Sequence, residues 1–269
     1  MDCLDKFRYE YIILRKGSVM EGLEYLYELF ESMPRGGPGN SSSTRRAFEM
    51  IPELPEGPFI LDIGCGQAVQ TLELARIAGG RIVALDNHQP FLDELMKRAT
   101  KEGLNEKIIP TNMSMMDMDF EDGTFDLIWS EGALYTMGFQ KGLRKCFELL
   151  KNNAYMAVSE MVLFSSESPE PVMEYLKNEY PPITTVQGNL EMIEDEGFLL
   201  KGHFPLEHAA WLENFYEPME KELSRLEKKY QGNNTASGFF DSMRKEIEMY
   251  KKYNQFYGYE FFVIKKQGI

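Results

Sequence analysis

The stretch Phe59-Ile60-Leu61-Asp62-Ile63-Gly64-Cys65-Gly66, followed by Arg81-Ile82-Val83-Ala84-Leu85-Asp86, decides the fold. Each run is mostly apolar, as a buried parallel strand should be. Gly64 and Gly66 let the backbone turn tightly and approach a ligand closely, at the sheet edge where open α/β folds bind ligands. Asp86 ends the second strand, where its carboxylate can accept hydrogen bonds from two ribose hydroxyls. The pattern therefore predicts a site for a nucleotide cofactor.

The residues around the two glycines distinguish between two classes of cofactor. A dinucleotide site needs a third glycine for close helix packing, and Val69 stands in that place. Asp62, the polar residue within the first strand, would repel a pyrophosphate and should instead face a polar group of the cofactor. S-adenosylmethionine (SAM) carries an ammonium and a sulfonium and has no phosphate, so an acidic cradle favours SAM.

The motifs that follow agree with this choice. The run 61–66 resembles motif I of class I SAM-dependent methyltransferases, and Leu85-Asp86-Asn87 resembles the acidic loop of that family. Residues 112–130 are similar to its next loop, turn and fourth strand, and the helix 139–150 leads into a turn typical of the family before strand five. The runs 154–164, 198–206 and 257–266 are expected as strands five, six and seven. The close resemblance covers residues 55–165.

The resemblance implies a fold and a branch of the family. The fold is Rossmann-like α/β, a doubly wound, seven-stranded, mostly parallel sheet with an antiparallel last strand. The nearest branch comprises small-molecule methyltransferases of the ubiquinone and menaquinone biosynthesis type. Within it, the runs 35–40 and 129–135 resemble an uncharacterised bacterial and archaeal subgroup, which carries no substrate assignment.

The resemblance also implies which residues bind the cofactor. Asp86 should bind the ribose, and Asn87 should lie beside the adenine. Ser114 stands where the family usually has Asp, and its hydroxyl can still accept a hydrogen bond from the adenine amino group. The complete predicted cofactor set is Asp62, Gly64, Cys65, Gly66, Gln70, Thr71, Asp86, Asn87, Ser114, Met115, Ser130 and Glu131.

The chain is longer than a minimal core of this kind. We expect the core to occupy residues 51–207 and 257–269, with an N-terminal helical cap at 1–50 and a helical insertion at 208–256. The cap includes helical spacing over 5–33 and a helix at 44–51 that Ser41 to Thr44 can cap. We assign the cap and the insertion to a lid over the sheet edge; the alternative for the insertion is a dimerisation surface.

The composition of the chain disfavours several classes of binding partner. The net charge of −14 disfavours nucleic acid, which requires a basic surface. No apolar run is long enough to span a bilayer, and the N-terminus lacks signal-peptide features, so we expect a cytoplasmic protein that does not associate with membranes. Three cysteines and three histidines at wide spacing predict neither disulfides nor a metal site. A monomer and a homodimer both remain open.

The catalytic residues are less determined, because methyl transfer from SAM is an in-line displacement that mainly requires alignment and exclusion of water. A general base is needed only for a protonated nucleophile. The candidates are Glu131, Tyr135, His203 and His208. Substrate contacts could come from Gly39, Tyr135, Trp211 and Tyr216, although the aromatic residues and the histidines could equally be structural.

The sequence favours a SAM-dependent methyltransferase that acts on a small molecule. Two alternatives are weighed against it. One is a SAM-binding regulatory protein without catalysis, which intact cofactor motifs do not exclude. The other is a nicotinamide-dependent oxidoreductase with a degenerate glycine turn, which Val69 disfavours.

Overall fold

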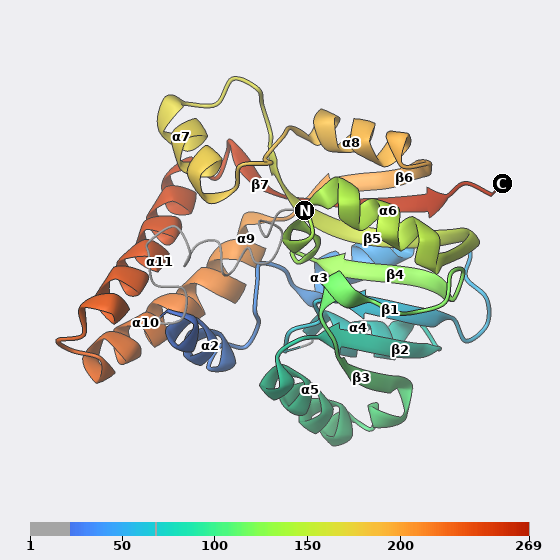
Figure 1. Cartoon of the computed structure of the whole chain (residues 1–269), viewed down its shortest axis with the longest axis horizontal. Coiled ribbons are helices and arrows are strands. Elements are labelled where there is room, and N and C mark those ends of the chain that lie inside the picture. The colour runs from blue at the N-terminus through green and yellow to red at the C-terminus, as the bar shows by residue number, and fades with distance from the viewer. Residues whose placement is uncertain (1–21, 68, 269) are drawn as a thin grey trace.

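The computed structural model describes residues 22–67 and 69–268, and its centre is one seven-stranded sheet (Figure 1). The strand order is β3-β2-β1-β4-β5-β7-β6. β7 runs antiparallel to both of its neighbours, whereas the other pairings are parallel. The predicted fold class is therefore confirmed. The strands are β1 Phe59–Ile63, β2 Arg81–Asp86, β3 Ile108–Asn112, β4 Phe125–Glu131, β5 Leu150–Leu163, β6 Phe198–Pro205 and β7 Tyr257–Lys266.

Helices cover both faces of the sheet, which explains why the central strands are apolar on both sides. Ile60 and Leu127 belong to one buried cluster, together with apolar residues of α4 and α5, whereas Leu61 and Ile128 belong to a second cluster with α6 and α8. Because successive side chains of a strand point to opposite faces of the sheet, each central strand contributes to both buried clusters. These helices are α4 Val69–Ile77, α5 Gln89–Glu102, α6 Phe139–Leu149 and α8 Val186–Asp195.

The N-terminal part differs from the expected boundaries. The predicted helical spacing over 5–33 lies partly outside the described residues, and within them it forms α2, Leu23–Glu31. The next helix, α3, spans Ser41–Glu49 and begins before the predicted start at Thr44. The reason is its cap: the Asn40 side chain accepts a hydrogen bond from the Ser43 backbone N–H at 2.8 Å, so the serines lie inside the first turn.

The insertion between β6 and β7 is helical, and it has more segments than the two helices that its sequence predicts at 209–230 and 237–253. It consists of α9 His208–Trp211, a π-helical segment Leu212–Tyr216, α10 Glu217–Lys229 and α11 Asn234–Tyr253. In Figure 1, α10 and α11 lie beside the sheet, and α2 lies next to α10. α7, Glu170–Glu179, belongs to the segment between β5 and β6.

Two other strands differ slightly from their expected bounds, and one of them, β6, ends at Pro205 and not at residue 206. β5 begins at Leu150, before the predicted start at residue 154, because Phe125 of β4 already pairs with Leu150. β7 has the predicted bounds. Among the described residues no helix is long and apolar enough to cross a bilayer.

Candidate cofactor site

The turn after β1 has the backbone that its glycines predict. Gly64 has φ of +69° and Gly66 has φ of +53°, in the left-handed region that favours glycine. The backbone N–H groups of Gly64 and Cys65 both donate to the Leu85 carbonyl, at 2.8 and 3.0 Å. A side chain at Gly64 would place its Cβ only 2.4 Å from the Cβ of Ala133. The turn is therefore closed against the end of β2 on one side and the loop after β4 on the other.

Asp86 joins this turn to the loop after β2. Its Oδ2 accepts a hydrogen bond from the Gly66 N–H, and its Oδ1 accepts one from the His88 N–H, each at 2.9 Å. Burial raises the pKa of Asp86 above its ordinary value, and these two backbone hydrogen bonds oppose that rise. The carboxylate is thus fixed at the carboxyl end of β2, where two ribose hydroxyls could reach its remaining lone pairs.

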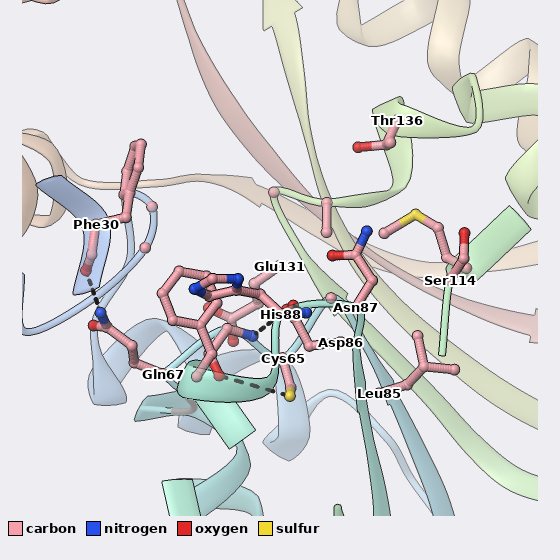
Figure 2. Close-up of a pocket in the computed structure, with 18 of the residues that line it drawn as sticks. Phe30, Cys65, Gln67, Leu85, Asp86, Asn87, His88, Ser114, Glu131 and Thr136 are labelled. Carbon is pink, nitrogen blue, oxygen red and sulfur yellow. Dashed lines mark hydrogen bonds between the residues drawn. The ribbon is translucent and has the colours of Figure 1, made fainter. Parts of the chain in front are cut away.

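A cavity of about 240 Å³ lies at this edge of the sheet. Figure 2 shows Phe30 and Gln67 at one end of it, His88 in the middle, and Asn87, Ser114 and Thr136 toward the other end. The Ser114 hydroxyl accepts a hydrogen bond from the Met116 N–H at 3.1 Å. The residues of the predicted cofactor set that line the cavity are Gly64, Cys65, Gly66, Gln70, Asp86, Asn87, Ser114, Met115 and Glu131.

Three residues of that set lie beneath the turn and not on the cavity wall. Asp62 is fully buried, and the Thr71 hydroxyl donates a hydrogen bond to its Oδ2. Burial raises the pKa of Asp62 to about 7. The Ser130 hydroxyl donates to the Ile63 carbonyl at 3.2 Å. Asp62, Thr71 and Ser130 therefore support the turn from below, and their direct contact with a cofactor stays a prediction.

Glu131 is not a free carboxylate. Its side chain is 2% exposed, and it forms an ion pair with Arg35 through Oε2. Its Oε1 accepts hydrogen bonds from the Thr44 hydroxyl at 2.8 Å and from the Trp129 indole N–H at 2.9 Å. These contacts oppose the role of a general base that the sequence suggested. Instead, Glu131 ties the segment before β1 to the end of β4.

The other catalytic candidates do not lie on the cavity wall. His203 is hydrogen-bonded to Glu260 on the neighbouring strand β7. The Nδ1 of His208 lies 3.3 Å from the Tyr250 hydroxyl, and Tyr135 packs edge-on against Tyr180 with ring centroids 5.7 Å apart. Their positions favour the structural alternatives, and none of the three lines the cavity.

The residues that the sequence suggested as substrate contacts also lie outside the cavity wall. Trp211 stacks on Tyr250 with ring centroids 4.3 Å apart, and Tyr216 donates to Glu246 at 3.1 Å; both residues are buried in the core that α9 to α11 form. The Gly39 N–H donates to the Ala210 carbonyl at 3.2 Å. The helical face that these aromatic residues share therefore packs into the core.

The cap was expected over the sheet edge, but the α2 side chains that line the cavity were not among the predicted site residues. Tyr27 of α2 stacks on His88 with ring centroids 4.0 Å apart, and the His88 Nε2 lies 2.7 Å from Glu31 Oε1. The apolar spacing on this helix was recognised in the sequence, but spacing alone does not say which of its side chains face the cavity. The α2 residues on the cavity wall are Leu23, Leu26, Tyr27 and Phe30.

Comparison with known proteins identifies the central part of the chain. Residues 60–153, which hold the glycine turn and Asp86, match the family model described as "Methyltransferase domain". This part of the chain is a methyltransferase domain. The cofactor of such class I domains is SAM, in agreement with the prediction from the acidic cradle. Among residues 22–67 and 69–268, no group of three or more metal-binding side chains comes together.

Two proteins are similar to this chain, one in sequence and one in fold. Sterol 24-C-methyltransferase of Eremothecium gossypii is 29% identical over 121 residues, which are 44% of this chain and 32% of that protein. The chain thus matches about a third of the length of this relative. A SAM-dependent methyltransferase from Geobacter sulfurreducens, solved with S-adenosylhomocysteine (SAH), has a TM-score of 0.78 at 15% identity. That alignment covers 90% of this chain and 98% of the other.

One protein with a similar fold is named for a reaction other than methyl transfer. The [4+2]-cyclase SpnF has a TM-score of 0.68 and 20% identity, over 88% of this chain and 86% of its own. At such identity both structures show a shared fold and nothing about the acceptor. The methyltransferase domain therefore fixes the fold and the cofactor class, whereas the reaction partner must be argued from the cavity.

Proposed function

We propose that this protein transfers a methyl group from SAM to a small-molecule acceptor. The observation that carries the proposal is the Asp86 carboxylate, which is fixed by the glycine turn and by the His88 N–H at the wall of the cavity. In this arrangement Asp86 holds the ribose hydroxyls, and Asn87 and Ser114 lie where the adenine would bind. SAM supplies the electrophilic methyl group, and the protein aligns it with the acceptor.

The wall that α2 and α5 contribute supports an acceptor with apolar surface. The α2 side chains Leu23, Leu26 and Phe30 line the cavity, as does Phe91 of α5. Such a wall excludes water from the transferring methyl group, which prevents hydrolysis and strengthens the local electrostatics. The sterol methyltransferase among the relatives acts on an apolar molecule by its name, which agrees with this wall.

The remaining parts of the chain complete the proposal. We assign residues 1–50, of which 22–50 are described, and the insertion 208–256 to a lid beside a core at 51–207 and 257–269. α2 supports this assignment because it lies on the cavity. A cytoplasmic location and the absence of nucleic-acid partners remain predictions from the sequence.

A second function has a specific observation in its favour. A structural neighbour is named for a cyclisation, so the fold accommodates proteins that are described by reactions other than methylation. A SAM-binding protein that does not transfer the methyl group therefore stays the alternative. The nicotinamide-dependent alternative loses support, because residues 60–153 match a methyltransferase domain.

Calorimetric titration tests the proposal first. SAM and SAH should bind saturably to the dialysed protein, whereas NADH should not bind. Methyl-labelled SAM is then incubated with the protein and acceptors of several classes, namely sterols, quinols, phenols, amines and thiols. Binding without labelled product across these classes would support the non-catalytic alternative. A protein that binds neither SAM nor SAH would refute the proposal.

A further inference from the structure

Helix α2 presents two opposite faces to two different parts of the molecule. One face lines the cofactor cavity with Leu23, Leu26, Tyr27 and Phe30. An α-helix has about 3.6 residues per turn, so the positions two residues after these point away from the cavity. That opposite face contacts residues 225–230 of the insertion through Tyr25, Glu28 and the C-cap residue Ser32. α2 therefore lies between the cofactor cavity and the insertion (Figure 1).

The carboxylate of Glu28 joins α2 to the insertion. Lys229 Nζ donates to Oε1 at 2.7 Å and to Oε2 at 2.8 Å, and the Tyr230 hydroxyl donates to Oε2 at 2.6 Å. The Arg225 guanidinium adds an attraction at 3.7 Å. Burial acts to raise the pKa of Glu28, but the hydrogen bonds from Lys229 and Tyr230 outweigh it, so the pKa lies below its ordinary value. Glu28 is thus ionised at neutral pH, and its hydrogen bonds are charge-assisted.

The insertion is itself anchored on the sheet. Trp211 of α9 packs edge-on against Tyr259 of β7 with ring centroids 4.8 Å apart, and Tyr250 of α11 packs edge-on against Tyr257 of β7 at 5.8 Å. All four residues are buried. The insertion is therefore a fixed support against which α2 is held.

The cofactor cavity is closed in part by α2. Its side chains form one part of the wall, and Gly66 and Asp86, after β1 and at the end of β2, form another. A second cavity, of about 540 Å³, is lined by residues 31–34 at the end of α2 and shares Gln67 and Phe91 with the first. A shift of α2 would open the wall between the two cavities and give the cofactor a path to exchange.

From this arrangement we propose that Glu28 is a positioning residue, through which the insertion holds α2 over the cofactor and limits the rate of cofactor exchange. Glu28 lies on the face of α2 that points away from the cavity, so loss of its charge favours opening equally in the free and the loaded protein. The association and dissociation rate constants of the cofactor then rise by the same factor. The inference rests on the proposed function and adds control of cofactor exchange to it.

The kinetics of SAH binding to immobilised protein, measured by surface plasmon resonance, test the proposal. Glu28→Gln keeps the size of the side chain and an oxygen that accepts hydrogen bonds, but it removes the charge. The side chains of Glu28 and Lys229 are 25% and 50% exposed. We therefore expect both rate constants to rise about fivefold, the upper end of the range for one partly exposed ion pair. The dissociation constant, which is their ratio, should stay within about twofold of the wild type.

A matched control and a second variant isolate the effect. Glu220→Gln makes the same chemical change in an ion pair that joins α10 to α11, where Lys251 Nζ donates to both carboxylate oxygens at 2.8 Å. It should leave both rate constants within about twofold of the wild type. Lys229→Met removes the cation from the other side of the Glu28 contact and should raise both rate constants. In the double variant the two effects should not add, because each substitution removes the same contact.

Hydrogen exchange provides a second readout that needs no cofactor. The backbone amides of α2 should exchange about fivefold faster in Glu28→Gln than in the wild type, because exchange follows the release of the helix. In Glu220→Gln they should exchange at the wild-type rate. Equal exchange of α2 in the wild type and in Glu28→Gln would overturn the inference.

The outcomes separate the inference from the proposed function. Two SAH rate constants that rise together support the inference. Unchanged rate constants, or a rise in the dissociation rate constant alone, overturn it while SAM binding stands. If the wild-type protein binds neither SAM nor SAH, the proposed function fails, and the inference about cofactor exchange fails with it.

Discussion

Replacing Glu131 by glutamine distinguishes a structural carboxylate from a catalytic one. The glutamine keeps the size of the side chain and an oxygen that can accept from Thr44 and Trp129. It cannot neutralise Arg35, whose side chain is only 8% exposed. The variant therefore leaves a buried cation without its counter-charge, which is more damaging than the loss of an exposed ion pair.

The expected loss is large for one substitution. Removing one partner of a buried ion pair costs about 3–5 kcal/mol of unfolding free energy. In a protein of this size each kcal/mol lowers the melting temperature by roughly 2–4 °C, so the loss is on the order of 10 °C. Thermal unfolding followed by circular dichroism, without ligand, measures it. A urea titration gives the unfolding free energy at fixed temperature.

Two controls accompany this variant. Glu73 is a buried carboxylate whose arginine partners, Arg45 and Arg76, are 52% and 37% exposed, so Glu73→Gln leaves its cations in contact with water and should cost less. The double variant Glu131→Gln with Arg35→Met removes both charges and should recover much of the stability. A Glu131→Gln protein with an unchanged melting temperature and no methyl transfer would refute the structural role and restore Glu131 as a catalytic residue.

Three further predictions concern the cofactor turn. Asp86→Ala should weaken SAH by about 1–3 kcal/mol, since hydrogen bonds to a charged group are lost; unchanged affinity by calorimetry would exclude Asp86 as the ribose ligand. The pKa of Asp62 is raised to about 7 by burial, so between about pH 4 and 7 the folded state binds more protons than the unfolded state, and stability falls as the pH rises. In urea unfolding across this range, the unfolding free energy of the wild type should decline by up to about 4 kcal/mol, and Asp62→Asn should remove this decline. The same decline in both proteins would contradict the raised pKa of Asp62. Gly64→Ala should reduce SAH affinity at least about tenfold, because its Cβ meets Ala133 and its φ is +69°, and a variant that binds SAH like the wild type would show that the turn adapts.

The sheet could be predicted from the sequence because its signals are local. The apolar runs that end in Gly64 and Asp86 identify β1 and β2, and the bounds of β7 were predicted correctly. Boundaries that depend on one hydrogen bond were less accurate. α3 begins before Thr44 because Asn40, and not a serine, caps it.

The site was predictable only where the motif is local. Gly66 and Asp86 come from neighbouring strands of the motif, and both line the cavity. Arg35 and Glu131 are far apart in the sequence, and their ion pair exists because the loop before α3 packs against the end of β4. Likewise, no local pattern says that Trp211 is buried among the insertion helices while Tyr27 reaches the cavity. These facts depend on packing between segments.

The place of the insertion in the chain also has an evolutionary consequence. Residues 208–256 leave the sheet after β6 and return at β7, and the Leu206 N–H donates to the Tyr259 carbonyl at 2.8 Å, so the two ends meet. A segment with adjoining ends can be lengthened, shortened or replaced by recombination without changing the path of any strand. β1 and β2 lie away from this junction in the strand order. Descendants of such a chain can therefore diversify at the insertion while they inherit the glycine turn and Asp86 unchanged.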